Sequence, residues 1–134
     1  MKLITSILIL LSLVILSSCG DSIKSSLDKQ LAESDSIKVY FFNEKDNRVE
    51  KVVTISDKPE IEKIIASISD ESSEQYKCGH NGQLEFYKNG TIVMSPQFNT
   101  GEGCEHYVFR FKDRMYHKIM TGEGKQLLEG LLSK

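Results

Sequence analysis

Most of the chain alternates between hydrophobic and polar positions with the period of two that is typical of β-strands. Segments of this kind that are also rich in β-branched and aromatic residues predict six strands. They lie at residues 37–42, 49–55, 83–88, 91–95, 107–111 and 115–120. Asn89-Gly90 lies between two of them and predicts a hairpin turn of type I′, in which both residues have positive φ.

Two other segments have the period of an amphipathic helix. The first begins with Asp57 as its N-terminal cap and Pro59 in its first turn, where a missing N–H costs nothing. Its apolar residues are spaced i, i+3, i+4 and i+7: Ile61, Ile64, Ile65 and Ile68. The second is expected to begin at Thr121, with an inner face made of Leu127, Leu128, Leu131 and Leu132. Residues 67–74 are polar and predict a loop.

The predicted order is ββαββββα, with strands in hairpins and helices between or after them. This order is typical of an α+β fold, and we expect an antiparallel sheet of about six strands with two helices packed on one face. Alternation along the strands predicts that Tyr40 and Phe42 point away from Phe41, and that Tyr87 points away from Phe86. The resulting aromatic residues on the uncovered face have two interpretations, which are the shielding of a solvent-facing sheet or a surface for a partner.

The N-terminus has a different pattern. Met1-Lys2 is a short positive start, and Leu3 to Leu16 is almost wholly apolar before Ser17-Ser18 and Cys19. A charged start, an apolar run and a small-residue end are the layout of a secretory signal peptide. The apolar run of about 14 residues would make roughly 21 Å of helix, which is short for a hydrocarbon core of about 30 Å.

The end of this segment, Leu16-Ser17-Ser18-Cys19, resembles the lipobox of bacterial lipoproteins. The resemblance implies that the Cys19 thiol receives a diacylglyceryl group, that the chain is cut before Cys19, and that the new amine is acylated, as with palmitate. It also implies a protein of the cell envelope that faces the periplasm or the exterior. Gly20 rather than Asp follows the cysteine, which would allow transfer to the outer membrane in a cell with two membranes. An ordinary signal peptide and an uncleaved anchor are the alternatives.

This resemblance divides the chain into three parts. Residues 1–18 are expected to be the signal peptide, residues 19–36 the lipidated cysteine and a flexible tether, and residues 37–134 a single domain. The segment 19–36 is mostly polar, as in a tether. Its apolar residues Ile23, Leu27 and Leu31 would allow one or two turns of helix, but the stripe is thin.

The charge of the chain excludes one class of partner. The formal charge of the whole chain is −2, and loss of Lys2 with the signal would make it −3. A weakly acidic chain without a block of Lys and Arg has no electrostatic footprint for nucleic acid. The same balance predicts no attraction to an anionic membrane surface, so the lipid would do the anchoring. We find no cofactor motif and expect no cofactor.

Two cysteines remain besides Cys19. Cys78 and Cys104 are expected to form a disulfide, since an exported protein meets an oxidising environment. The segments Cys78-Gly79-His80 and Cys104-Glu105-His106 repeat one C-x-H pattern. Two thiolates and two imidazoles would suit zinc, so a zinc site made of Cys78, His80, Cys104 and His106 is the alternative, although the usual zinc spacing is absent.

Two hypotheses for function follow. In the first, the protein is a non-enzymatic binding or accessory protein of the envelope. It would use the sheet face away from the helices, near the Cys78 and Cys104 loops, to bind an envelope protein or a small ligand. In the second, it is a zinc-binding protein or a metal-dependent enzyme that uses the four Cys and His residues. The sequence contains no catalytic motif that favours an enzyme.

Overall fold

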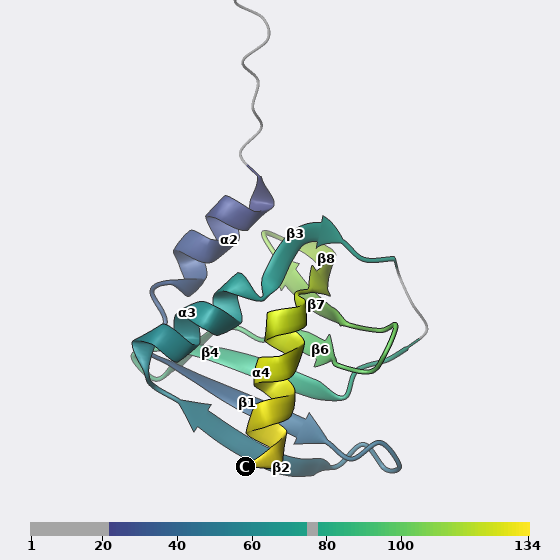
Figure 1. Cartoon of the computed structure of the whole chain (residues 1–134). Helices are drawn as coiled ribbons and strands as arrows, with labels where there is room; N and C mark the ends of the chain where they lie inside the picture. The colour runs from purple at the N-terminus through teal and green to yellow at the C-terminus, as the bar shows by residue number, and fades with distance from the viewer. Residues whose placement is uncertain (1–21, 75–77) are drawn as a thin grey trace, which may run out of the picture.

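Eight antiparallel strands form one sheet, and three helices of the described chain lie against it (Figure 1). The structure is a computed structural model that describes residues 22–74 and 78–134. The predicted α+β class and antiparallel sheet are confirmed, whereas the predicted count of six strands and two helices is wrong. The proposed signal sequence at residues 1–18 and Cys19 lie outside the described residues.

The helices and strands have the following bounds. The helices are α2 (Ile23–Leu31), α3 (Lys58–Ala66) and α4 (Gly122–Ser133). The strands are β1 (Ser36–Phe42), β2 (Val49–Ile55), β3 (Ile68–Ser72), β4 (Gly82–Lys88), β5 (Thr91–Met94), β6 (Gln97–Asn99), β7 (His106–Phe111) and β8 (Arg114–Met120). Each of the six predicted strands therefore overlaps an observed strand.

The strands run across the sheet in the order β2-β1-β4-β6-β7-β8-β3, and β5 pairs with β4. Most neighbours are close in sequence, because hairpin turns or short loops join them. The turn between β4 and β5 has φ of 51° at Asn89 and 76° at Gly90, as the type I′ prediction requires. Lys112 and Asp113 also have positive φ, at 47° and 62°, and form the tight turn between β7 and β8.

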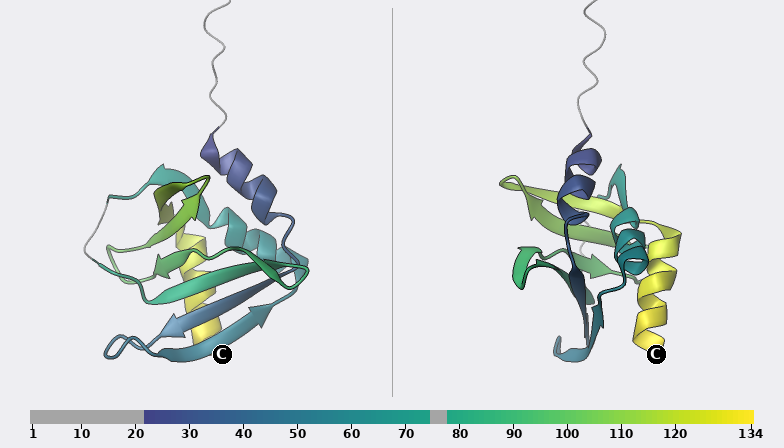
Figure 2. Two further views of the ribbon diagram at one scale, coloured as in Figure 1. Left: turned by 180° about the vertical axis from the view of Figure 1, so that it is seen from behind. Right: turned by 90° about the vertical axis from the view of Figure 1, so that its left-hand side faces the viewer.

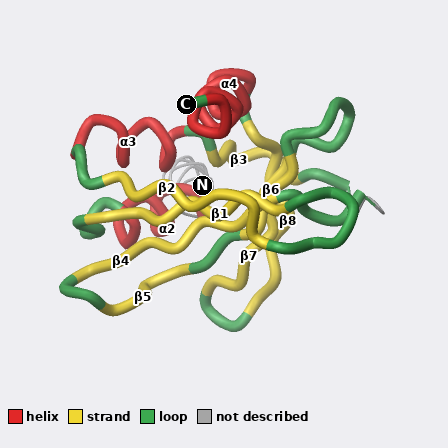
Figure 3. Tube along the Cα trace, turned by 90° about the horizontal axis from the view of Figure 1, so that it is seen from below, coloured by secondary structure: helices red, strands yellow, loops and turns green. Residues whose placement is uncertain are grey.

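The inner face of the sheet is turned toward the helices and carries the core. Alternate residues of β1 and β4 are fully or almost fully buried, as period-two patterning requires: Ile37, Val39, Phe41, Leu84 and Phe86. The buried aromatic residues of β7 are Tyr107 and Phe109, with Phe111 at its end. Figures 2 and 3 show α3 and α4 together on one side of the sheet.

The two predicted helices form where the sequence places them. Asp57 caps α3 by accepting a hydrogen bond from the Glu60 N–H, and Ile61, Ile64 and Ile65 are buried. Thr121 caps α4 in the same way, and Leu128 and Leu131 face the core. The prediction for Leu132 is wrong, since that side chain is 43% exposed near the end of the helix.

The prediction of a flexible tether over residues 19–36 is wrong from Ser22 onward. Ser22 caps α2 by accepting a hydrogen bond from the Lys24 N–H, and both Leu27 and Leu31 are buried in the core. A thin apolar stripe suffices here because the helix docks on a preformed surface and does not have to be stable alone. None of the helices in the described part of the chain is long and apolar enough to cross a membrane.

The prediction of a loop at residues 67–74 is also wrong, because β3 forms there as an edge strand on β8. Ile68 is fully buried, and the neighbouring Ser67 hydroxyl lies 2.6 Å from the hydroxyl of Tyr107. Farther along, Lys118 of β8 is buried and donates to the Asp70 carbonyl at 2.6 Å. The side chains of residues 70–72 are polar and exposed. This strand forms through backbone pairing, so its sequence contains no hydrophobic alternation that could have predicted it.

Docking of α2 predicts the effect of one substitution. Leu31→Ala removes a side chain with no exposed surface, which is expected to lower the free energy of unfolding by roughly 2–5 kcal/mol. Lys29→Ala, on the exposed side of the same helix, is the control and should change it by less than about 0.5 kcal/mol. Urea denaturation checks both, and equal stability of the two variants would contradict the docked position of α2.

Candidate functional site

A disulfide joins Cys78 to Cys104, with the two Cα atoms 6.1 Å apart. It connects the segment before β4 to the segment before β7, so it pins two loops at the same end of the sheet. The predicted pairing is therefore found in the structure. Because each sulfur is bonded to the other, neither cysteine offers a thiolate.

The histidines of the predicted zinc set lie on the sheet face opposite the helices, but they do not form a metal centre with the cysteines. His80 is half-buried, with its Nε2 3.3 Å from the Gln97 side-chain nitrogen and its ring 5.9 Å from that of Phe42. His106 begins β7 and points away from the buried Tyr107 by strand alternation. Within residues 22–74 and 78–134, no group of three or more metal-binding side chains has the geometry of a metal site.

His106 is unusual among the described polar residues. Its side chain is only 5% exposed, and its Nδ1 atom is buried without a hydrogen-bond partner among the described residues. Burial lowers the pKa of His106 below its usual range, and the charges of His117 and His80 act in the same direction. The imidazole is therefore neutral at pH 7.

A second group of candidate residues lies on the half of the sheet built from β2, β1, β4 and β5. We call its helix-free side the outer sheet face. By register and alternation it comprises Val49, Val52, Lys38, Tyr40, Phe42, Gln83, Glu85, Tyr87 and Ile92. The side chains of Tyr40 and Phe42 are on the other face of the sheet from Phe41, and that of Tyr87 is on the other face from Phe86, as the sequence predicts. In Figure 2 the described helices α3 and α4 leave this side of the sheet uncovered.

Glu85 is the centre of a hydrogen-bonded network on this face. Tyr40 Oη donates to Glu85 Oε2 at 2.8 Å, and Tyr87 Oη donates to the same oxygen at 2.5 Å. Gln83 Nε2 donates to the other carboxylate oxygen at 3.3 Å, and Lys38 Nζ lies 5.2 Å from the centre of the Tyr87 ring. Donation to the carboxylate raises the pKa of both phenols, so the tyrosines stay protonated at pH 7.

Exposed apolar side chains surround this network. Val49 is 53% exposed, Val52 48% and Ile92 47%. Each is paired across to an aromatic residue of the neighbouring strand: Val49 with Phe42, Val52 with Tyr40 and Ile92 with Tyr87. They are three of the five large hydrophobic side chains that are exposed in the described chain. Apolar positions beside tyrosines that are already held in place form a surface that loses little conformational entropy on binding.

The sequence identified part of this surface and missed its centre. Alternation placed Tyr40, Phe42 and Tyr87 on one face, but it gave Glu85 no role. The spacing Gln83-Glu85-Tyr87, opposite the apolar Leu84 and Phe86, contained the signal that these three residues share a face. The proximity of Tyr40 to Glu85 could not be read, because it depends on the register of β1 against β4.

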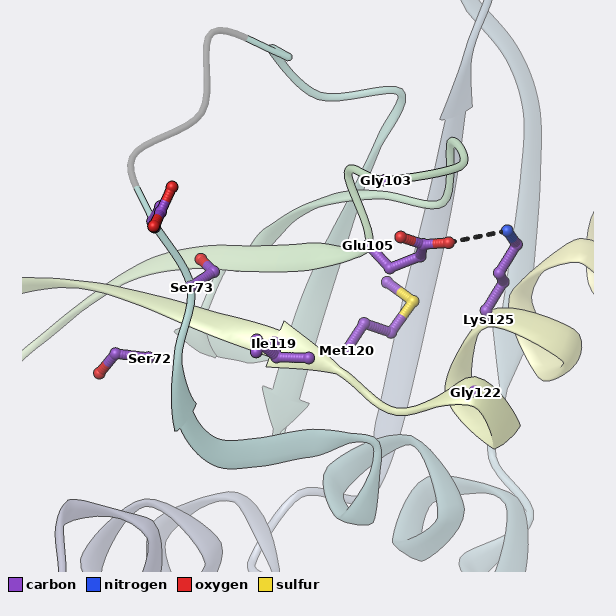
Figure 4. Close-up of a pocket in the computed structure, with 9 residues that line it drawn as sticks. Ser72, Ser73, Gly103, Glu105, Ile119, Met120, Gly122 and Lys125 are labelled. Carbon is purple, nitrogen blue, oxygen red and sulfur yellow. Dashed lines mark hydrogen bonds and ion pairs between the residues drawn. The ribbon is translucent and has the colours of Figure 1, made fainter.

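A cavity of about 510 Å³ lies elsewhere, between the end of β3, the end of β8 and the start of α4 (Figure 4). Glu105 Oε1 and Lys125 Nζ form an ion pair of 3.0 Å at its wall, while Ser72, Ser73 and Ile119 line the other side. The ion pair lowers the pKa of Glu105 and raises that of Lys125. The two charges of this pair neutralise each other, and Glu74 adds a further carboxylate to the lining.

Comparison with known protein families, with curated proteins and with solved structures found no significant match to this chain. The candidate site therefore depends on the geometry and chemistry of these residues alone.

The disulfide leads to a prediction about stability. Cys78→Ser or Cys104→Ser removes the bridge between two positions that are 26 apart in sequence. The chain-entropy model then gives a decrease in the free energy of unfolding of roughly 3–4 kcal/mol. In a domain of this size that loss corresponds to a fall in melting temperature on the order of 10 °C. Thermal unfolding of the oxidised wild type, the reduced wild type and either variant measures it. Identical transitions in all samples would show that the bridge does not stabilise the fold.

The environment of His106 predicts a pH dependence. The pKa of His106 is near 6.5 in the unfolded chain and lower in the folded protein. Between these two values the unfolded state therefore binds more protons. Stability is thus fully present above about pH 6.5 and falls as the pH decreases, by at most about 1.4 kcal/mol per pH unit. The carboxylates contribute little to this change above pH 5, because they are ionised in both states.

His106→Gln should reduce the loss of unfolding free energy between pH 7.5 and pH 5, while His117→Gln is the control and should retain it. Denaturant titrations at both pH values measure the change. The assignment to His106 is wrong if the two variants have the same pH dependence as the wild type.

Proposed function

We propose that this protein is a bacterial lipoprotein of the cell envelope that binds a protein partner through the outer sheet face. In this proposal its role is that of a binding or accessory protein and not of an enzyme. A lipid on Cys19 holds it at a membrane, and the domain faces the periplasm or the exterior.

The observation that carries the binding role is the arrangement of Val49, Val52 and Ile92 around the Glu85 network. Contact surfaces of proteins combine apolar centres with aromatic residues that have polar ends, and this face offers both. Glu85 keeps lone pairs for donors of a partner, and Lys38 adds a charge of opposite sign nearby. The inner face cannot serve in this way, since the three described helices and the core occupy it.

The anchoring role is supported by the residues before Cys19 and by the disulfide, which suits an exported protein. The zinc alternative, with Cys78, His80, Cys104 and His106 as ligands, requires thiolates that the disulfide removes. No geometric observation favours it over the binding role.

A crosslinking experiment tests the binding role. A photoreactive amino acid is placed at Val52 or Ile92 on the outer sheet face, and at the exposed Glu62 of α3 as the control, in the lipidated protein in intact cells. We expect one discrete crosslinked protein from positions 52 and 92 that is absent from position 62. The additional substitution Val52→Asp should abolish the product formed from position 92. Products that are the same at all three positions, or none from the outer sheet face, would contradict the proposal.

A fractionation experiment tests the anchor. The wild-type protein should sediment with membranes, and mass spectrometry should find a diacylglyceryl group on an N-terminal Cys19. Cys19→Ser should lose both properties. Leu16→Gly is a useful second variant, because it alters the sequence before the cut and leaves the cysteine in place. A Cys19→Ser protein that keeps its lipid and its membrane association would show that the anchor is elsewhere.

A further inference from the structure

We propose that the tip of the β7–β8 hairpin binds the surface of the membrane through anionic phospholipid headgroups, so that the domain lies against the bilayer. This inference rests on the lipid anchor of the proposed function and deepens it. The surface consists of Arg110, Lys112, Arg114 and Met115 with the exposed Lys29 of α2 beside them. We call these five residues the basic tip.

The first argument is the length of chain between the proposed lipid and the folded domain. Helix α2 is docked on the core, so its cap Ser22 has a fixed position relative to the sheet. Three Cα–Cα steps separate Cys19 from Ser22, which span at most roughly 11 Å. A domain joined to its lipid by so short a link must have one end close to the headgroups.

The second argument is which part of the domain occupies that end. In all views of Figures 1 and 2, the start of α2 and the β7–β8 turn lie at the same end of the molecule. Residues of both elements line one shallow pocket, in which Ser26 and Lys29 of α2 lie beside Phe111 and Lys112. The β1–β2 turn, with Glu44 and Asp46, lies at the opposite end of the sheet.

The third argument is charge. The side chains of Arg110, Lys112 and Arg114 are exposed and form no ion pair with any residue in the described ranges. The acidic groups at this end are largely compensated, since Asp28 pairs with Lys24 and Asp70 lies 3.8 Å from Lys118. Glu33, which lines the same pocket as Lys29 and Lys112, pairs with Lys88. Asp113 in the turn and Glu71 on β3 are further exposed carboxylates, and Asp21 lies in the link between Cys19 and Ser22.

The basic tip therefore has an excess of positive charge on a chain whose formal charge is −2. Composition alone predicted no attraction to an anionic surface, and the fold changes that expectation by collecting basic residues at the anchored end. Each Lys or Arg near an anionic bilayer strengthens binding by roughly fivefold. Met115 is 52% exposed beside them and can enter the interfacial region, where apolar side chains are stabilised.

The test uses the chain from Cys19 onward, which contains every described residue, with Cys19 coupled through a maleimide to a phospholipid. Its thiol is the free one, because the other two cysteines form the disulfide. The coupled protein is placed on vesicles of phosphatidylethanolamine with phosphatidylglycerol, or on vesicles of phosphatidylcholine alone. Amide hydrogen exchange is then measured for the β7–β8 turn and, as an internal reference, for the β1–β2 turn.

We expect amides of residues 110–116 to exchange at least fivefold more slowly on the anionic vesicles than on the neutral ones, with no change in the β1–β2 turn. The triple variant Arg110→Gln, Lys112→Asn and Arg114→Gln should lose this protection. Asn is chosen at position 112 because it tolerates the positive φ found there. The matched control, Lys45→Gln, Lys63→Gln and Lys134→Gln, removes the same charge elsewhere and should keep the protection.

Equal exchange on the two kinds of vesicle, or slower exchange in the β1–β2 turn, would overturn the proposal. Chemical coupling supplies the lipid whatever the cell does with Cys19. Protection of the basic tip together with an unmodified Cys19 in cells would thus refute the natural anchor alone, whereas lipidation without protection would refute the basic tip alone.

Discussion

The packing of α2 against the core is the contact that determines how the rest of this protein can act. Leu27 and Leu31 bury completely or almost completely, and Gln30 donates to the Val93 carbonyl of β5 at 3.5 Å. These contacts turn a polar segment after Cys19 into a fixed part of the domain. The proposed lipid on Cys19 would then position the whole sheet relative to a membrane, because only a short length of chain separates Cys19 from α2.

The two faces of the sheet have different roles. The inner face is filled by the core and by the described helices, so it supplies stability. The outer sheet face holds Tyr40 and Tyr87 against Glu85 and leaves apolar side chains around them exposed. Its order comes from two hydrogen bonds to Glu85. The bond from Tyr40 crosses between β1 and β4 and depends on their antiparallel register, and the bond from Tyr87 lies within β4. The disulfide closes the end of the sheet near His106, whose imidazole is buried.

The sequence predicted those parts of the fold in which a local pattern decides the outcome. Asp57 and Pro59 define the start of α3, and the alternation of Ile37, Val39 and Phe41 defines the buried side of β1. The prediction from sequence failed where contacts between distant parts of the chain determine the structure. β3 forms because β8 offers a backbone edge and because Ser67 bonds to Tyr107, and neither feature is local. The same limit applies to the candidate site, since alternation placed Tyr40 and Tyr87 on one face but could not bring Tyr40 to Glu85, which lies on another strand.

Hydrogen exchange of the backbone amides in α2 tests the central claim most directly, with the lipidated protein in a bilayer. Docking on the core predicts that the amides near Leu27 and Leu31 exchange as slowly as those of the buried strand β1. Exchange at the rate of an unstructured peptide, with β1 still protected, would contradict it. The segment after Cys19 would then be a tether after all, and the position of the domain on the membrane would be free.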